Sequence, residues 1–130
     1  EAALVPARAH TQEDLLDEYA RAELLVLSSR EETAPQIIAQ AMACGLPIVS
    51  SAAGGVPHMV RDGETAGLFP VGDVPACAEQ IRRLLADDAR RAAMSARIAT
   101  EARERFHPDA VAEKTVAVYR AVTAAAGSSG

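Results

Sequence analysis

The chain has 130 residues, enough for one domain and too few for several. Apolar residues make up 49% and aromatic residues only 3%, so the core has to be built mainly from Ala, Leu, Val and Ile. The net charge of -5 at pH 7 argues against a nucleic-acid-binding protein, because such proteins need a basic face.

Cysteine usage and hydropathy indicate the cellular compartment of the protein. Cys44 and Cys77 lie in separate predicted helices without a partner at metal-like spacing, so we expect no disulfide framework and predict a cytoplasmic protein. No apolar run approaches the length of a membrane span, and the start does not resemble a signal peptide. The chain opens abruptly without Met, which predicts a piece of something longer.

The first 45 residues predict helix, strand and helix. Thr11 is expected to cap a helix whose first turn is acidic. Residues 23–29, "ELLVLSS", are apolar without alternation, which is typical of a strand covered on both faces in a parallel sheet. Residues 33–44 predict a second helix, with Pro35 in its first turn and Gly45 as its stop. The apolar face of the first helix consists of Leu15, Leu16, Tyr19 and Ala20.

The middle of the chain predicts two more strands around a glycine loop. "LPIVSS" is a second buried strand, and "AAGGVPHMV" is a loop followed by a short helix from Pro57. Asp62-Gly63 forms a turn, and "GLFPV" is a third, brief strand.

The last third of the chain predicts helices only. Asp73 caps a helix with one apolar face, residues 88–106 form a mostly surface helix, and residues 109–124 form the last helix. The low-complexity residues 125–130 are predicted to be a disordered tail. The apolar face after Asp73 consists of Val74, Cys77, Ala78, Ile81, Leu84 and Leu85.

Alternating strands and helices predict an α/β fold, a partial doubly wound (Rossmann-like) parallel sheet with flanking helices. Three strands make a poor sheet, so we expect further strands upstream of Glu1.

Two loops leave the carboxyl ends of predicted strands and run into helix N-termini, where unpaired N–H groups suit phosphate. Glu32 precedes one helix, as a cap or as an acceptor of sugar hydroxyls. Gln40 follows eight residues later, about 12 Å along a helix. The pair Gly54-Gly55 either lets the backbone approach a ligand or forms a plain turn.

An ordered series of motifs resembles the C-terminal, donor-binding half of a group 1 type retaining glycosyltransferase with the two-domain GT-B fold. The resemblance covers roughly residues 11–124. Its motifs are Glu32, then Gln40-Ala41-Met42-Ala43, Gly45, Pro47-Ile48-Val49, Gly54-Gly55, Asp62-Gly63, Gly67-Leu68 and Gly72-Asp73. Residues 1–124 are accordingly predicted to be a partial nucleotide-sugar-binding domain.

The resemblance implies a role for each site residue. Glu32, the catalytic candidate, would contact hydroxyls of the transferred sugar. The N–H groups of Thr33, Ala34 and Gln36 would meet the sugar or the diphosphate, while Pro35 has no N–H to donate. Position 40 would hold the ribose, but the family's usual Glu is Gln here, so the charge-assisted hydrogen bond is lost.

The implied reaction transfers a sugar from a nucleoside diphosphate to an unknown acceptor, with retention. His58 stands where the family often has Glu, and we interpret it as a surface residue. The family's basic Arg and Lys have no counterpart here, because Arg8 and Arg30 are misplaced. We expect no cofactor or metal, an absent N-terminal acceptor domain and an inactive isolated fragment. The absent half leaves room for peripheral membrane association.

Three other functions stay open at this point. A nucleotide-sugar epimerase would use acid and base side chains in an upstream domain. A receiver-like binding domain would need an acceptor Asp at a strand end, where this chain has serines. A non-catalytic GT-B relative acting in assembly fits Gln40 in place of Glu.

Overall fold

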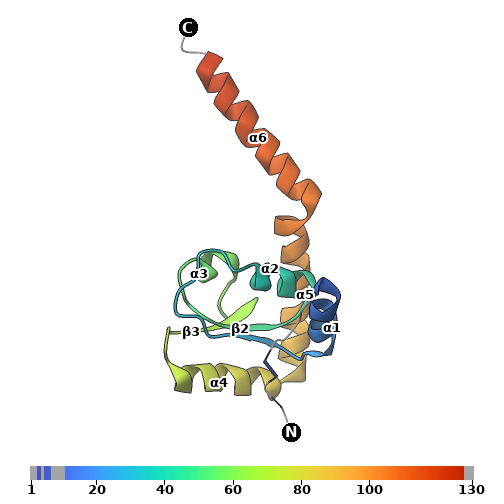
Figure 1. The fold of residues 1–130 in the computed structure, drawn as a ribbon, viewed down its shortest axis with the longest axis vertical. Coiled ribbons are helices and arrows are strands. Elements are labelled where there is room, and N and C mark those ends of the chain that lie inside the picture. Colours follow the sequence, from blue (N-terminus) through green and yellow to red (C-terminus); the bar gives the residue numbers. More distant parts are fainter. Residues whose placement is uncertain (1–2, 4, 7–10, 128–130) are drawn as a thin grey trace.

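The computed structural model describes residues 3, 5–6 and 11–127. The described part alternates helices and short strands (Figure 1). The elements in chain order are α1 (Gln12–Arg21), β1 (Leu25–Leu27), α2 (Gln36–Ala43), β2 (Ile48–Ser51), α3 (Val56–Met59), β3 (Ala66–Phe69), α4 (Val74–Leu85), α5 (Asp88–Phe106) and α6 (Pro108–Gly127).

The three strands form a parallel sheet in the order β1-β2-β3, with Val26 opposite Val49 and Val49 opposite Gly67. Every residue of β2 is buried, as expected for a central strand with both faces covered. All of β1 is half-buried rather than fully buried, although Leu25, Val26 and Leu27 all pack against the core.

Helices lie on both sides of this sheet. In Figure 1, α4 lies on one side, and α2 and α3 lie on the other. Helix α5 packs against both α2 and α4, and Ser95 Oγ donates to the carbonyl of Gly45, just after α2. The core between these layers is aliphatic, as the composition predicts, and it includes Ile38, Met42, Ile48, Val49, Leu84, Met94 and Ile98.

Local capping signals place several helix ends correctly. Thr11 Oγ1 accepts from the N–H of Asp14 at 3.1 Å, and Asp14 Oδ2 accepts from the N–H of Thr11 at 3.0 Å, a complete capping box. Asp73 Oδ1 accepts from the N–H of Ala76, and Gly45 ends the preceding segment with a φ of +68°. The predicted caps and stop are therefore confirmed.

Other boundaries and faces differ from the predictions. Helix α2 begins at Gln36 with Pro35 as its N-cap, and α3 begins at Val56. Val74 is 74% exposed, so it does not belong to the apolar face of α4. Helix α5 is less of a surface helix than expected, because Met94, Ile98, Glu101 and Ala102 are buried.

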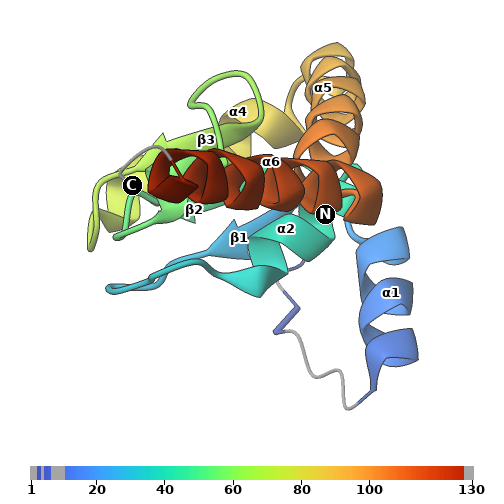
Figure 2. The ribbon, with the colours of Figure 1, turned by 90° about the horizontal axis from the view of Figure 1, so that it is seen from above.

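Helix α6 extends away from the rest of the protein (Figure 1), so it lies in front of the sheet when the molecule is seen from above (Figure 2). Its backbone stays helical to Gly127, three residues into the segment predicted to be a tail, and residues 128–130 lie outside the described part. Among the described residues, no helix combines the length and the hydropathy that a bilayer crossing requires.

The loops that follow β1 and β2 contact each other through Gly54 and Gly55. A Cβ on Gly54 would lie 1.8 Å from the carbonyl oxygen of Glu32, and a Cβ on Gly55 would lie 1.7 Å from that of Thr33. Gly54 also has a φ of +48°, in the left-handed region. The two glycines therefore allow the backbones of the two loops to pack closely. Neither of the roles considered from the sequence, a plain turn or the approach of a ligand, explains this packing alone.

We expect Gly54→Ala to lower the free energy of unfolding by about 3 kcal/mol or more, because the new methyl overlaps backbone that cannot rotate away. Gly63→Ala is the matched control, since Gly63 also has a positive φ, +77°, but has open space around it. The control should lose only about 1–2 kcal/mol. Urea unfolding of both variants measures the difference, and equal losses would contradict the role of the loop contact.

Candidate functional site

The candidate site lies where the loops after β1 and β2 meet. Ser51 Oγ donates to the carbonyl of Ser29 at 2.6 Å, and the N–H of Gly55 donates to the carbonyl of Glu32 at 3.0 Å. These two bonds join the loops at the carboxyl ends of neighbouring parallel strands, which is where ligands bind in open α/β sheets. The structure thus brings Glu32 and Thr33 beside Gly54 and Gly55.

The side chain of Glu32 is half-buried and does not cap α2. Ser29 Oγ donates to Glu32 Oε1 at 2.7 Å, while the N-cap of α2 is Pro35, without a side-chain cap. No other described residue donates to the carboxylate. Glu32 is therefore held at one oxygen by the loop, and its other oxygen can accept a hydrogen bond from a ligand hydroxyl.

The N-terminus of α2 offers donors that the described protein does not use. The N–H groups of Thr33, Ala34 and Gln36 donate to no acceptor within the described part of the chain, and all three residues are exposed. The first turn of α2 contains no acidic residue. Unpaired N–H groups at an eight-residue helix attract an anion such as phosphate.

Gln40 lies on α2, half-buried, and its Oε1 accepts from the hydroxyl of Tyr19 at 3.3 Å. Burial raises the pKa of Tyr19, and electrostatic interaction with Cys44 and Glu18 raises it further, so the phenol stays protonated and donates. The Gln40 amide nitrogen is left to meet a ligand. The sequence predicts that Glu32 and Gln40 lie about 12 Å apart along one helix. That prediction is wrong, because α2 begins at Gln36 and Glu32 lies in the loop before it.

Other observations delimit the site. His58 is exposed on α3. Among the described residues, no group of three or more His, Cys, Asp or Glu side chains could hold a metal ion. A surface hollow beside α5 contains none of the predicted site residues, and it is lined by Arg61, Glu64, Ala96, Arg97, Thr100, Glu101 and Glu104.

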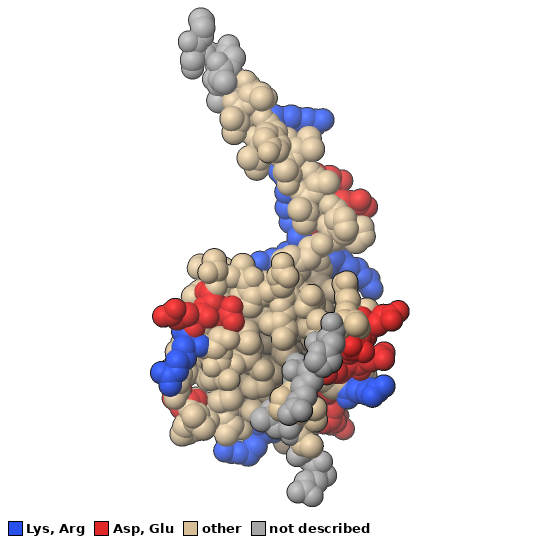
Figure 3. All heavy atoms as spheres, in the orientation of Figure 1, with Lys and Arg blue, Asp and Glu red and all other residues tan. Residues whose placement is uncertain are grey.

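The face shown in Figure 3 is largely uncharged at its centre, with Lys, Arg, Asp and Glu gathered at its margins.

Two contacts of the site were not predicted from the sequence. From the sequence, Ser29 is only the end of a predicted strand, and Tyr19 is only part of an apolar helix face. Polar residues in those positions are common, so nothing in the sequence singles out their partners.

A family model described as "Glycosyl transferases group 1" matches residues 5–87. A D-inositol 3-phosphate glycosyltransferase from Streptomyces bingchenggensis is 36% identical over 109 residues, which is 84% of this chain and 24% of that protein. The chain spans about a quarter of the length of the curated relatives it matches.

Solved structures share the fold. A sucrose-phosphate synthase from Thermosynechococcus elongatus superposes with a TM-score of 0.76 at 33% identity, over 86% of this chain and 28% of that one. Anabaena Alr3699/HepE, in complex with UDP, gives a TM-score of 0.78 at 23% identity, over 85% of this chain and 30% of that one.

The predicted fold, part of the Rossmann-like parallel sheet of a GT-B glycosyltransferase, is confirmed by these likenesses and by the three-stranded parallel sheet. The ordered motifs of the sequence and the match over residues 5–87 agree. The chain belongs to the group 1 glycosyl transferases.

Proposed function

We propose that this chain binds the nucleoside-diphosphate sugar donor of a retaining glycosyltransferase, for transfer to an acceptor that another part of the protein selects. The observation that carries the proposal is the set of unused N–H groups of Thr33, Ala34 and Gln36 beside the half-buried carboxylate of Glu32. Together they provide an anion site next to a hydroxyl acceptor, which matches a diphosphate linked to a sugar.

Each group has a separate task in this proposal. The backbone N–H groups hold the diphosphate and stabilise the charge that grows on it as the sugar leaves. Glu32 accepts hydrogen bonds from sugar hydroxyls and orients the ring, with Ser29 fixing its other oxygen. The amide of Gln40 donates to the ribose, since its carbonyl is occupied by Tyr19.

Gly54 and Gly55 act in this proposal mainly by letting the second loop lie against the first.

The donor is a substrate, and the transfer proposed here uses no resident cofactor or metal. Two cysteines, both free, favour a reducing compartment, and a cytoplasmic location follows from them as part of the proposal. Membership of the family favours the transferase over an epimerase.

Glu32→Ala in the natural full-length protein is expected to lower the turnover number about a hundredfold, because the sugar loses the acceptor that orients it. Nucleotide release from UDP-, ADP- and GDP-sugars measures the rate. Glu31→Ala is the matched control, because Glu31 is the exposed acidic neighbour of Glu32. An unchanged rate in Glu32→Ala would remove Glu32 from the site.

Gln40→Glu is expected to tighten nucleoside diphosphate binding about tenfold, because a carboxylate forms stronger, charge-assisted hydrogen bonds with ribose hydroxyls. Calorimetric titration of the full-length protein with UDP, ADP and GDP measures the affinity. Gln12→Glu, exposed on α1, adds the same charge elsewhere and should have no effect. Failure of both the wild type and Gln40→Glu to bind any of the three would favour the non-catalytic assembly role.

The isolated 130-residue chain is expected to release no nucleotide above background from UDP- or GDP-sugars. The physical reason is that the proposal assigns the acceptor site and the basic Arg and Lys to segments outside this sequence. The same release assay, with the full-length protein as the positive control, makes the comparison. Robust turnover by the isolated chain would show that the proposed division of the active site is wrong.

A further inference from the structure

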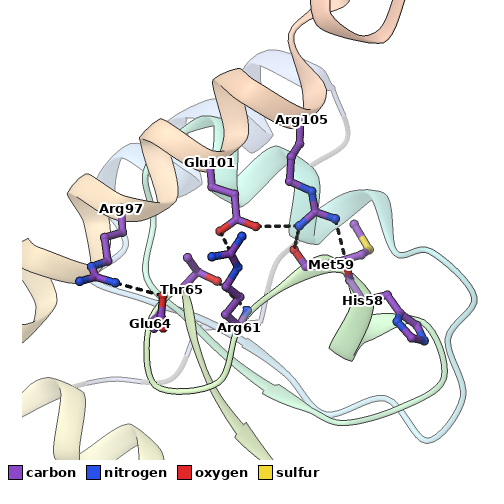
Figure 4. Close-up of polar contacts among 8 residues, drawn as sticks. All are labelled: His58, Met59, Arg61, Glu64, Thr65, Arg97, Glu101 and Arg105. Atoms are coloured by element: carbon purple, nitrogen blue, oxygen red, sulfur yellow. Dashed lines mark hydrogen bonds and ion pairs between the residues drawn. The ribbon is translucent and has the colours of Figure 1, made fainter. Parts of the chain in front are cut away.

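Helix α5 carries a buried carboxylate, Glu101, between two arginines (Figure 4). Arg105 Nη1 lies 2.8 Å from Glu101 Oε1, and Arg61 Nε lies 3.8 Å from Glu101 Oε2. The Glu101 side chain is only 11% exposed. A carboxylate at this depth needs charged partners, because its desolvation would otherwise be unfavourable.

Arg105 connects this carboxylate to the short helix α3. Its Nη1 also donates to the carbonyl of Met59 at 2.7 Å, and its Nη2 donates to the carbonyl of His58 at 2.8 Å (Figure 4). These carbonyls belong to the last turn of α3, where a helix has no N–H donors of its own to offer them. The planar guanidinium reaches both carbonyls and the carboxylate at once, and it lies 5.3 Å from the centre of the Phe106 ring.

Helix α3 has its other end on the candidate site. Its N-cap is Gly55, whose N–H donates to the carbonyl of Glu32 and whose Cα lies against the carbonyl of Thr33. A helix of four residues has little stability of its own, so the groups at its two ends and the burial of Val56 fix where it lies.

We infer that Glu101 and Arg105 are positioning residues for donor binding, an inference that rests on the proposed function of the two loops. The carboxylate of Glu101 orients the guanidinium, the guanidinium holds the carboxyl end of α3, and α3 holds Gly55 against Glu32 and Thr33. Neither residue contacts the donor. Their effect reaches the diphosphate through the placement of the N–H groups of the first loop.

The experiment uses the natural full-length protein, with UDP, ADP and GDP titrated separately by calorimetry and with kcat and KM measured by nucleotide release. Arg105→Met is expected to raise the dissociation constant of the nucleotide that the wild type binds by about tenfold or more, because small misplacements of binding groups have large effects. Arg105→Lys keeps the charge and can reach one carbonyl, so its affinity should lie between those of the wild type and Arg105→Met.

Two controls on the same helix separate placement from general stability. Arg97→Met removes an exposed ion pair with Glu64, at 3.0 Å, and should keep the affinity within about twofold. Ile98→Val trims a fully buried side chain, so it should lower the melting temperature and leave the dissociation constant unchanged.

The inference is overturned if Arg105→Met binds nucleotide within about twofold of the wild type. It is also overturned if Ile98→Val weakens binding as much as Arg105→Met at the same loss of melting temperature. Failure of the wild type to bind any of the three nucleotides would overturn the proposed function itself, a result that differs from both of these.

Discussion

The contact between the two loops at the ends of β1 and β2 is the constraint on which the candidate site depends. The carbonyls of Glu32 and Thr33 occupy the space that side chains at positions 54 and 55 would fill, and the N–H of Gly55 bonds to the first of them. Since those carbonyls face the second loop, the N–H groups of the same stretch are left without acceptors in the described protein. The packing of these carbonyls against the second loop thus leaves the N–H groups of the first loop exposed on its opposite side.

The start of α2 reinforces this arrangement. Pro35 is its N-cap and makes no side-chain cap, whereas α1 and α4 are capped by Thr11 and Asp73. An uncapped N-terminus costs a helix about 1 kcal/mol relative to a capped one. Burial of Ile38, Ala41 and Met42 against the core stabilises α2 instead, so its first N–H groups remain unused without loss of the helix.

Signals that act over a few residues were predictable from the sequence, and those that depend on distant partners were not. Thr11 and Asp73 bond to residues three positions away, so their caps follow from local pattern. The half-exposure of β1 and the burial of Glu101 depend on which elements pack beside them, which the pattern does not encode. The candidate site residues follow from ordered motifs, whereas Tyr19 and Arg105 make contacts 21 and 46 residues away in sequence.

The charge that the described residues supply at the proposed donor site is small compared with that of a diphosphate. The N-terminus of a helix contributes about half an elementary charge, which is less than a departing diphosphate carries. Two described arginines beside α3 already have partners, because Arg61 pairs with Glu101, and Arg105 bonds to Glu101 and to two carbonyls of α3. In the proposed arrangement these cations position α3, and the N–H groups of the first loop bind the donor. If the chain binds the donor as proposed, we expect cations from other segments of the protein to stabilise the rest of the charge on the leaving group.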